Sequence, residues 1–119
     1  MASQDFTEQL KELGFEAEDL GDGKISFKYI IPTGRFASHN INLGFIVPSD
    51  FSLTPPSGLH VSPRLLPLQP GGIHPGGGIH ESPFGPDWEY WSRPIHHWNS
   101  TRRTVRDVMA HVRHLFDTQ

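Results

Sequence analysis

Residues 71–83 read Gly-Gly-Ile-His-Pro-Gly-Gly-Gly-Ile-His-Glu-Ser-Pro, and the rest of the chain is organised around this stretch. Glycine loses much backbone freedom on ordering and proline lacks an amide donor, so neither a helix nor a strand interior is expected here. Two Ile-His pairs interrupt the glycines, and Trp88, Trp91 and Trp98 follow closely. A long loop with large apolar residues beside it is typical of a packed functional loop rather than a flexible linker.

The sequence before this loop carries the signals of an antiparallel sheet. Apolar side chains alternate with polar ones in residues 24–31 and 36–47, which is the period of a strand with one buried face. A Pro-Thr-Gly turn separates the two runs, so the strands are expected to pair as neighbours. Shorter strands are predicted on either side, at residues 15–20 and 58–61.

Two amphipathic helices are predicted, one near each end of the chain. In residues 3–13, Phe6, Leu10 and Leu13 share one face, and residues 100–116 carry a longer apolar stripe at helical spacing, with an N-cap in Asn99-Ser100-Thr101. The predicted fold is therefore α+β, an antiparallel meander of about four strands with a short N-terminal helix and a C-terminal helix packed on one face. We expect residues 1–119 to form a single domain, in which residues 62–99 are a long loop without regular structure.

Composition and charge exclude several classes of function. The 119 residues have a net charge of −3, which argues against a general nucleic-acid binder. There is no cysteine, so disulfides, thiolate nucleophiles and cysteine-ligated zinc are excluded. The apolar runs are too short to span a membrane, and no basic-plus-apolar signal opens the sequence, so a cytoplasmic location is expected.

The order of these motifs resembles the ubiquitin-conjugating enzyme superfamily, and the compact build is most similar to its bacterial branch. That family has an aromatic-Pro-x-x-Pro-Pro segment, which residues 51–56 match except for Ser52 at a position where proline is usual. Its His-Pro-Asn triplet is similar to His74-Pro75-Gly76. A tryptophan, a Ser-Pro-like step at residues 91–94 and an amphipathic helix then follow in the same order, so the resemblance covers roughly residues 3–116.

The departures from the family's pattern bear directly on its chemistry. The family transfers an acyl group through a cysteine thioester, and a thiolate suits this because it is nucleophilic near neutral pH and is readily displaced by an amine. The nucleophile position falls near His80, and Gly76 stands where the family has the asparagine that supports the oxyanion. The resemblance thus implies an active-site-like loop containing His74, Pro75, Gly76 and His80, with no catalytic residue and no cofactor.

The resemblance implies a non-catalytic binding module in a bacterial ubiquitin-like protein modification pathway. Its expected partners are a ubiquitin-like protein, an activating enzyme or an active conjugating enzyme, with no nucleic acid and no membrane. One alternative is a transferase that uses another nucleophile, for which Ser82 and His80 are the candidates. Ser82 would need an activated hydroxyl, and an acylated histidine would hydrolyse readily.

A second alternative is a metal-binding domain or metal-dependent hydrolase built on the histidine-rich loop. His74, His80, His96 and His97 lie on or beside the loop, with His60, Glu81 and Asp87 as further candidate ligands. Their spacing matches no strict zinc signature, and adjacent histidines on an extended chain point apart. We therefore expect no bound metal.

Overall fold

A computed structural model describes residues 2–34, 36–64, 79–95 and 97–118 of the chain. The chain begins with helix α1 (Ala2–Glu12), and helix α2 (Val105–Thr118) lies near its end. The strands are β1 (Glu18–Gly21), β2 (Lys24–Ile30), β3 (Asn40–Ile46), β4 (Gly58–Ser62), β5 (Ile79–Glu81) and β6 (Glu89–Ser92). A single turn of 3₁₀ helix, η1 (Trp98–Ser100), precedes α2.

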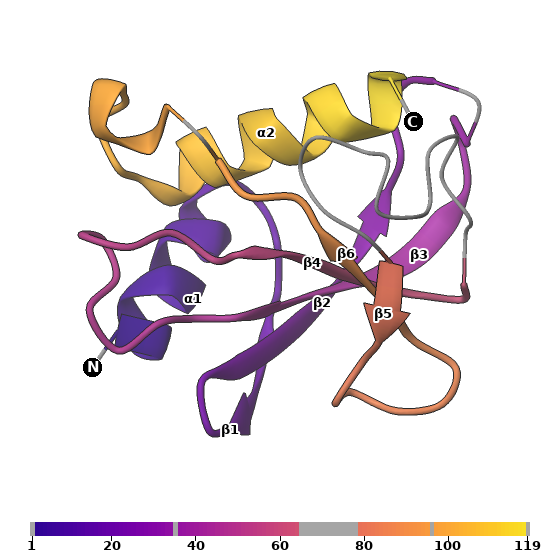
Figure 1. The fold of residues 1–119 in the computed structure, drawn as a ribbon, viewed down its shortest axis with the longest axis horizontal. Coiled ribbons are helices and arrows are strands. Elements are labelled where there is room, and N and C mark those ends of the chain that lie inside the picture. Colours follow the sequence, from indigo (N-terminus) through magenta and orange to yellow (C-terminus); the bar gives the residue numbers. More distant parts are fainter. Residues whose placement is uncertain (1, 35, 65–78, 96, 119) are drawn as a thin grey trace.

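The strands form one sheet in the order β1-β2-β3-β4-β6-β5, and every neighbouring pair is antiparallel. The first four strands follow one another as a meander (Figure 1). The hairpin between β1 and β2 turns at Asp22-Gly23, where both residues have positive φ, as the tight hairpin turns that suit the twist of paired strands require. The α+β fold, the meander and the two helices predicted from the sequence are thus confirmed.

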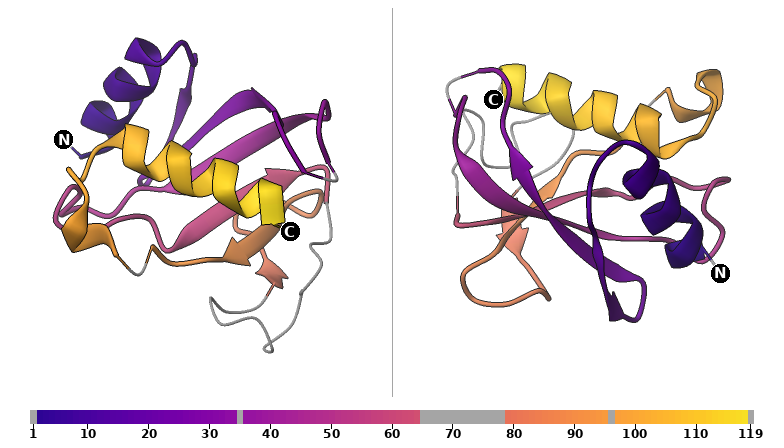
Figure 2. Two further views of the ribbon diagram at one scale, coloured as in Figure 1. Left: turned by 90° about the horizontal axis from the view of Figure 1, so that it is seen from above. Right: turned by 180° about the vertical axis from the view of Figure 1, so that it is seen from behind.

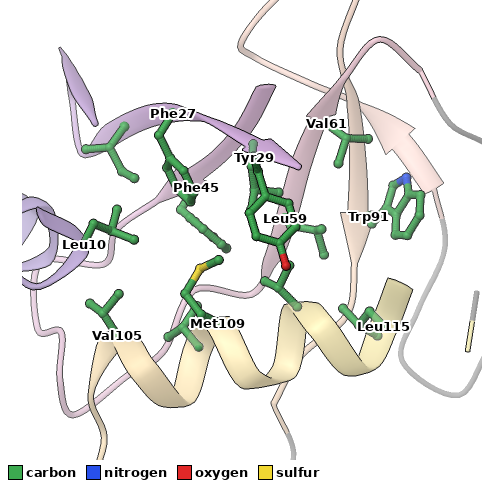
Figure 3. Close-up of a cluster of buried hydrophobic side chains, with 14 of the residues drawn as sticks. Leu10, Phe27, Tyr29, Phe45, Leu59, Val61, Trp91, Val105, Met109 and Leu115 are labelled. Carbon is green, nitrogen blue, oxygen red and sulfur yellow. The ribbon is translucent and has the colours of Figure 1, made fainter. Parts of the chain in front are cut away.

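Helix α2 lies across one face of the sheet, and most of the apolar core is buried between them (Figures 1 and 3). From β2 and β3, the alternate residues Phe27, Tyr29 and Phe45 point toward the helix, as their sequence period predicts. Helix α1 lies beside α2 (Figure 2), and its Phe6 and Leu10 are buried in the same core.

Two predictions about local structure are wrong. The stretch 62–99 contains β5, β6 and η1, so it is not without regular elements, and its two strands extend the meander to a sheet of six strands. The C-terminal helix begins at Val105 rather than near residue 100. Thr104 and Asp107 form a reciprocal cap: the Thr104 amide donates to the Asp107 carboxylate at 2.9 Å, and the Asp107 amide donates to Thr104 Oγ1 at 3.4 Å.

Candidate functional site

The candidate site lies on the sheet face opposite α2 and is centred on His60 of β4. Leu59 and Val61 point toward the core, so His60 between them faces the other side of the sheet. In the strand register, His60 stands opposite Gly44 of β3 and Tyr90 of β6. The backbone of His80 in β5 stands opposite Tyr90 in turn. A single row across four strands therefore joins Gly44, His60, Tyr90 and the backbone of His80.

Aromatic rings enclose the imidazole of His60, which is only 3% exposed. Its ring stacks on Tyr90, with centroids 4.6 Å apart and planes 23° apart, and contacts Phe84 at a centroid distance of 4.6 Å. Phe84 belongs to the connection between β5 and β6 and also contacts Trp88 at 4.9 Å. This connection thus folds back over the sheet and covers His60.

The covering connection requires a glycine beneath it. A Cβ atom at Gly44 would lie 2.8 Å from Cε2 of Phe84 and 3.2 Å from Cζ3 of Trp88. Both distances are shorter than ordinary van der Waals contact, so a side chain at this position would displace the aromatic rings from the sheet. The bare surface of β3 therefore fixes how closely the β5–β6 connection approaches His60.

Ser82 joins the end of β5 to His60 by a hydrogen bond. Its Oγ lies 2.8 Å from His60 Nδ1 and also accepts the backbone N–H of Phe84 at 3.1 Å. Burial lowers the pKa of His60 to about 4, so the ring is neutral near pH 7. In its Nε2–H tautomer the neutral ring accepts the Ser82 proton at Nδ1, and the hydroxyl then has a partner for its proton and one for its oxygen.

The Ser82–His60 pair has the connectivity of a nucleophile and its base, which bears on the alternative of a non-cysteine transferase. Its environment opposes that role. A base with a pKa of about 4 removes a hydroxyl proton poorly at neutral pH. The ring is also buried under Phe84 and Tyr90. The pair can hold the β5–β6 connection on the sheet more readily than it can activate Ser82.

Several of the predicted loop residues lie outside the described part of the chain. His74, Pro75 and Gly76 fall within residues 65–78, and His96 is also outside the described residues. For His80 the structure gives the backbone position in β5, opposite Tyr90. Within residues 2–34, 36–64, 79–95 and 97–118, no three His, Asp or Glu side chains gather in a way that could hold a metal ion. The absence of a bound metal remains a prediction.

The three tryptophans have different surroundings. Trp91 is fully buried and contacts Phe116 of α2 at a centroid distance of 5.5 Å. Trp98 is 4% exposed, and its indole N–H donates to the carbonyl of Ser52 at 2.9 Å. Trp88 is only half-buried, on the opposite face beside Phe84. The first two therefore anchor β6 and η1 to the core, while Trp88 borders the candidate site.

Sequence reasoning missed the hairpin of β5 and β6 and the bond between Ser82 and His60. A signal was present: residues 79–81 and 89–92 each mix apolar and polar residues, and Ser-Pro-Phe-Gly-Pro-Asp between them is rich in turn formers. The prolines on either side favoured a loop prediction instead. The contact with His60 depends on β6 lying between β4 and β5, which no local pattern indicates.

In the comparison with family models, the model of prokaryotic E2 family E matches residues 2–119. No curated protein and no solved structure matches the chain. The match spans both helices and all six strands. It agrees with the resemblance to bacterial ubiquitin-conjugating enzymes that the sequence motifs indicated. The chain therefore belongs to prokaryotic E2 family E, a bacterial family of ubiquitin-conjugating-like proteins.

Proposed function

We propose that this chain is a non-catalytic, ubiquitin-conjugating-like binding module in a bacterial ubiquitin-like protein modification pathway. The observation that carries the proposal is the absence of cysteine from a sequence that matches the family model from residue 2 to residue 119. Thioester transfer requires a thiolate that attacks one acyl donor and then leaves to an amine. A chain with this family's fold and no thiol cannot carry out that exchange.

The neighbourhood of the missing nucleophile supports the same conclusion. Ser82 is one residue beyond β5, and its hydroxyl is already engaged by His60 and by the Phe84 amide. The buried, neutral ring of His60 is a weak base for activating it. We accordingly assign His74, Pro75, Gly76 and His80 to an active-site-like loop that no longer performs chemistry.

What remains to such a chain is recognition of other proteins of the pathway. The partners that we propose are a ubiquitin-like protein, an activating enzyme or an active conjugating enzyme, and the proposed compartment is the cytoplasm. No helix in the described part of the chain is long and apolar enough to cross a membrane.

A charging assay tests the proposal. The chain is incubated with ATP and with a candidate activating enzyme, ubiquitin-like protein and active conjugating enzyme from the same organism. We expect no adduct on this chain that reductant cleaves, while a stoichiometric non-covalent complex with one of these proteins forms. The variant His80→Cys serves as a matched probe, because it places a thiol at the family's nucleophile position without altering the rest of the chain.

A covalent species on the native chain that discharges to an amine would overturn the proposal. Its loss in Ser82→Ala would identify the hydroxyl as the nucleophile and favour the transferase alternative. Absence of any complex with the ubiquitin-like protein, the activating enzyme and the active conjugating enzyme would contradict the binding role itself.

A further inference from the structure

One edge of the sheet is left partly uncovered by the shortness of β1. That strand pairs only with Lys24, Ile25 and Ser26 of β2. Strand β2 continues to Ile30 and pairs along its whole length with β3 on its other side. Within the described residues, no strand therefore lies beside the second half of β2 on its outer edge.

The backbone of Lys28 and Ile30 is directed toward this open edge. The Ile31 amide donates to the His39 carbonyl at 3.1 Å, and the Gly23 carbonyl accepts the Val47 amide at 2.8 Å, so both residues direct backbone groups toward β3. Backbone groups of successive residues in a strand point to alternate sides. Residues 28 and 30 therefore present their N–H and C=O groups outward, as a template for another strand.

A groove of about 620 Å³ runs beside this edge, between β2 and α2. Apolar side chains form much of its wall, among them Phe15, Tyr29 and Met109. Its charged lining residues are all basic: Lys28, Arg106 and Arg113. Burial raises the pKa of Tyr29, and the positive charge of Arg113 acts in the opposite direction, which places that guanidinium near the phenol. The groove thus gathers three cations along its wall, although the net charge of the chain is −3.

We propose that this edge and groove bind an extended acidic peptide segment of a protein partner. The peptide backbone would pair with Lys28 and Ile30 as an added strand of the sheet. An apolar peptide side chain would occupy the groove, and flanking Asp or Glu residues would meet Lys28, Arg106 and Arg113. The assignment rests on the proposed binding role and names the surface and the partner chemistry that would serve it.

A second copy of this chain fits the edge poorly. Antiparallel pairing of two β2 edges about a two-fold axis would bring the same three cations of each copy together. Repulsion between like charges opposes that contact, whereas an acidic segment neutralises them. Charge thus selects the acidic peptide over self-association.

The test is selection from a displayed library of random twelve-residue peptides, followed by fluorescence-anisotropy titration of the enriched peptides. We expect enrichment of peptides with an apolar centre flanked by Asp or Glu. Arg106→Gln/Arg113→Gln should weaken their binding about tenfold at low salt, from the loss of two exposed charge contacts. The control Lys11→Gln/Arg102→Gln removes the same charge from exposed positions outside the groove and should leave the affinity unchanged.

Backbone pairing is tested separately with N-methylated forms of the best peptide. Methylating alternate amides in the register that faces β2 should abolish binding, and methylating the intervening amides should be tolerated. The proposal is overturned by failure to enrich acidic peptides, by equal effects of the two double variants, or by equal tolerance of both methylated registers. Tighter binding of an RNA oligonucleotide or dimerisation through β2 would also overturn it. If the peptide proposal fails in one of these ways but the chain still binds a ubiquitin-like protein at another surface, the proposed function remains supported.

Discussion

Replacing Ser82 with alanine removes the hydroxyl that joins the end of β5 to the centre of the sheet. The substitution leaves Nδ1 of His60 without its partner at 2.8 Å, in a residue that is 3% exposed, and also takes the acceptor from the Phe84 amide. A buried polar group that loses its partner costs about 1–3 kcal/mol. We expect Ser82→Ala to lower the free energy of unfolding by that amount.

The matched variant is His60→Phe, which keeps a flat ring against Tyr90 and Phe84 and removes the nitrogen that needs a partner. In this background Ser82→Ala removes only the acceptor of the Phe84 amide. We therefore expect it to lower the free energy of unfolding by about 0.5–1 kcal/mol. The coupling between the two positions should then be about 1 kcal/mol or more.

Urea unfolding of the four proteins of this cycle at pH 7, followed by tryptophan fluorescence, measures the coupling. Equal losses on Ser82→Ala in the two backgrounds would refute the reasoning, because the bond to His60 would then contribute nothing to stability.

Three other predictions concern pH, the tryptophans and metal. A folded pKa of about 4 for His60, against an ordinary 6.5, means that the unfolded chain binds more protons between these pH values, so stability should fall by about 2–3 kcal/mol as pH drops from 6.5 to 4. Comparing pH-dependent melts with those of His60→Phe, which should lack this component, checks the sign. Trp91→Ala and Trp98→Ala should each cost about 3–5 kcal/mol and half-buried Trp88→Ala about 1 kcal/mol in urea unfolding, and equal losses at all three sites would contradict this order. Elemental analysis should find far less than one metal per chain and chelator should leave the melting curve unchanged, whereas stoichiometric zinc lost in His80→Ala would favour the metal-binding alternative.

The parts of the fold that the sequence predicted are those with a sustained local pattern. Strands β2 and β3 each have seven residues whose apolar side chains alternate with other residues, and α2 has a stripe of buried residues at helical spacing. Strands β5 and β6 have only three and four residues, too few for alternation to stand out among flanking prolines. Pairing of β6 with β4, and of β5 with β6, holds them in the sheet, and that pairing has no local signature.

The start of α2 shows a different limit of prediction from sequence. The Asn99-Ser100-Thr101 segment has good N-cap residues, yet it forms the 3₁₀ turn η1 and the chain extends again at Thr101. Thr104 and Asp107, three residues apart, carry the actual cap, and this spacing was visible in the sequence. The sequence thus offers two possible starts for the helix, one at residues 99–101 and one at Thr104. We attribute the later start to the burial of Val105 in the core.

The candidate site was predictable only in outline. The family resemblance predicts an active-site-like loop with His80 near the nucleophile position, because such a prediction depends only on motif order, and this stays a prediction. The Ser82–His60 bond joins residues 22 positions apart, and it required the strand order β4-β6-β5 to form. Identifying the buried histidine as the centre of the site therefore required the structure.

The position of β5 has a consequence for hydrogen exchange. This three-residue strand is the last in the sheet, and in the described part of the chain β6 is its one neighbour. Its amides can open by separating from β6 alone, while β6 stays paired with β4 and Trp91 stays buried against α2. Amides of β5 should therefore exchange through local opening, far faster than those of β3, which open only with the whole domain. The backbone that carries His80 would then belong to a separately opening unit, able to adjust to a bound protein while the core remains folded.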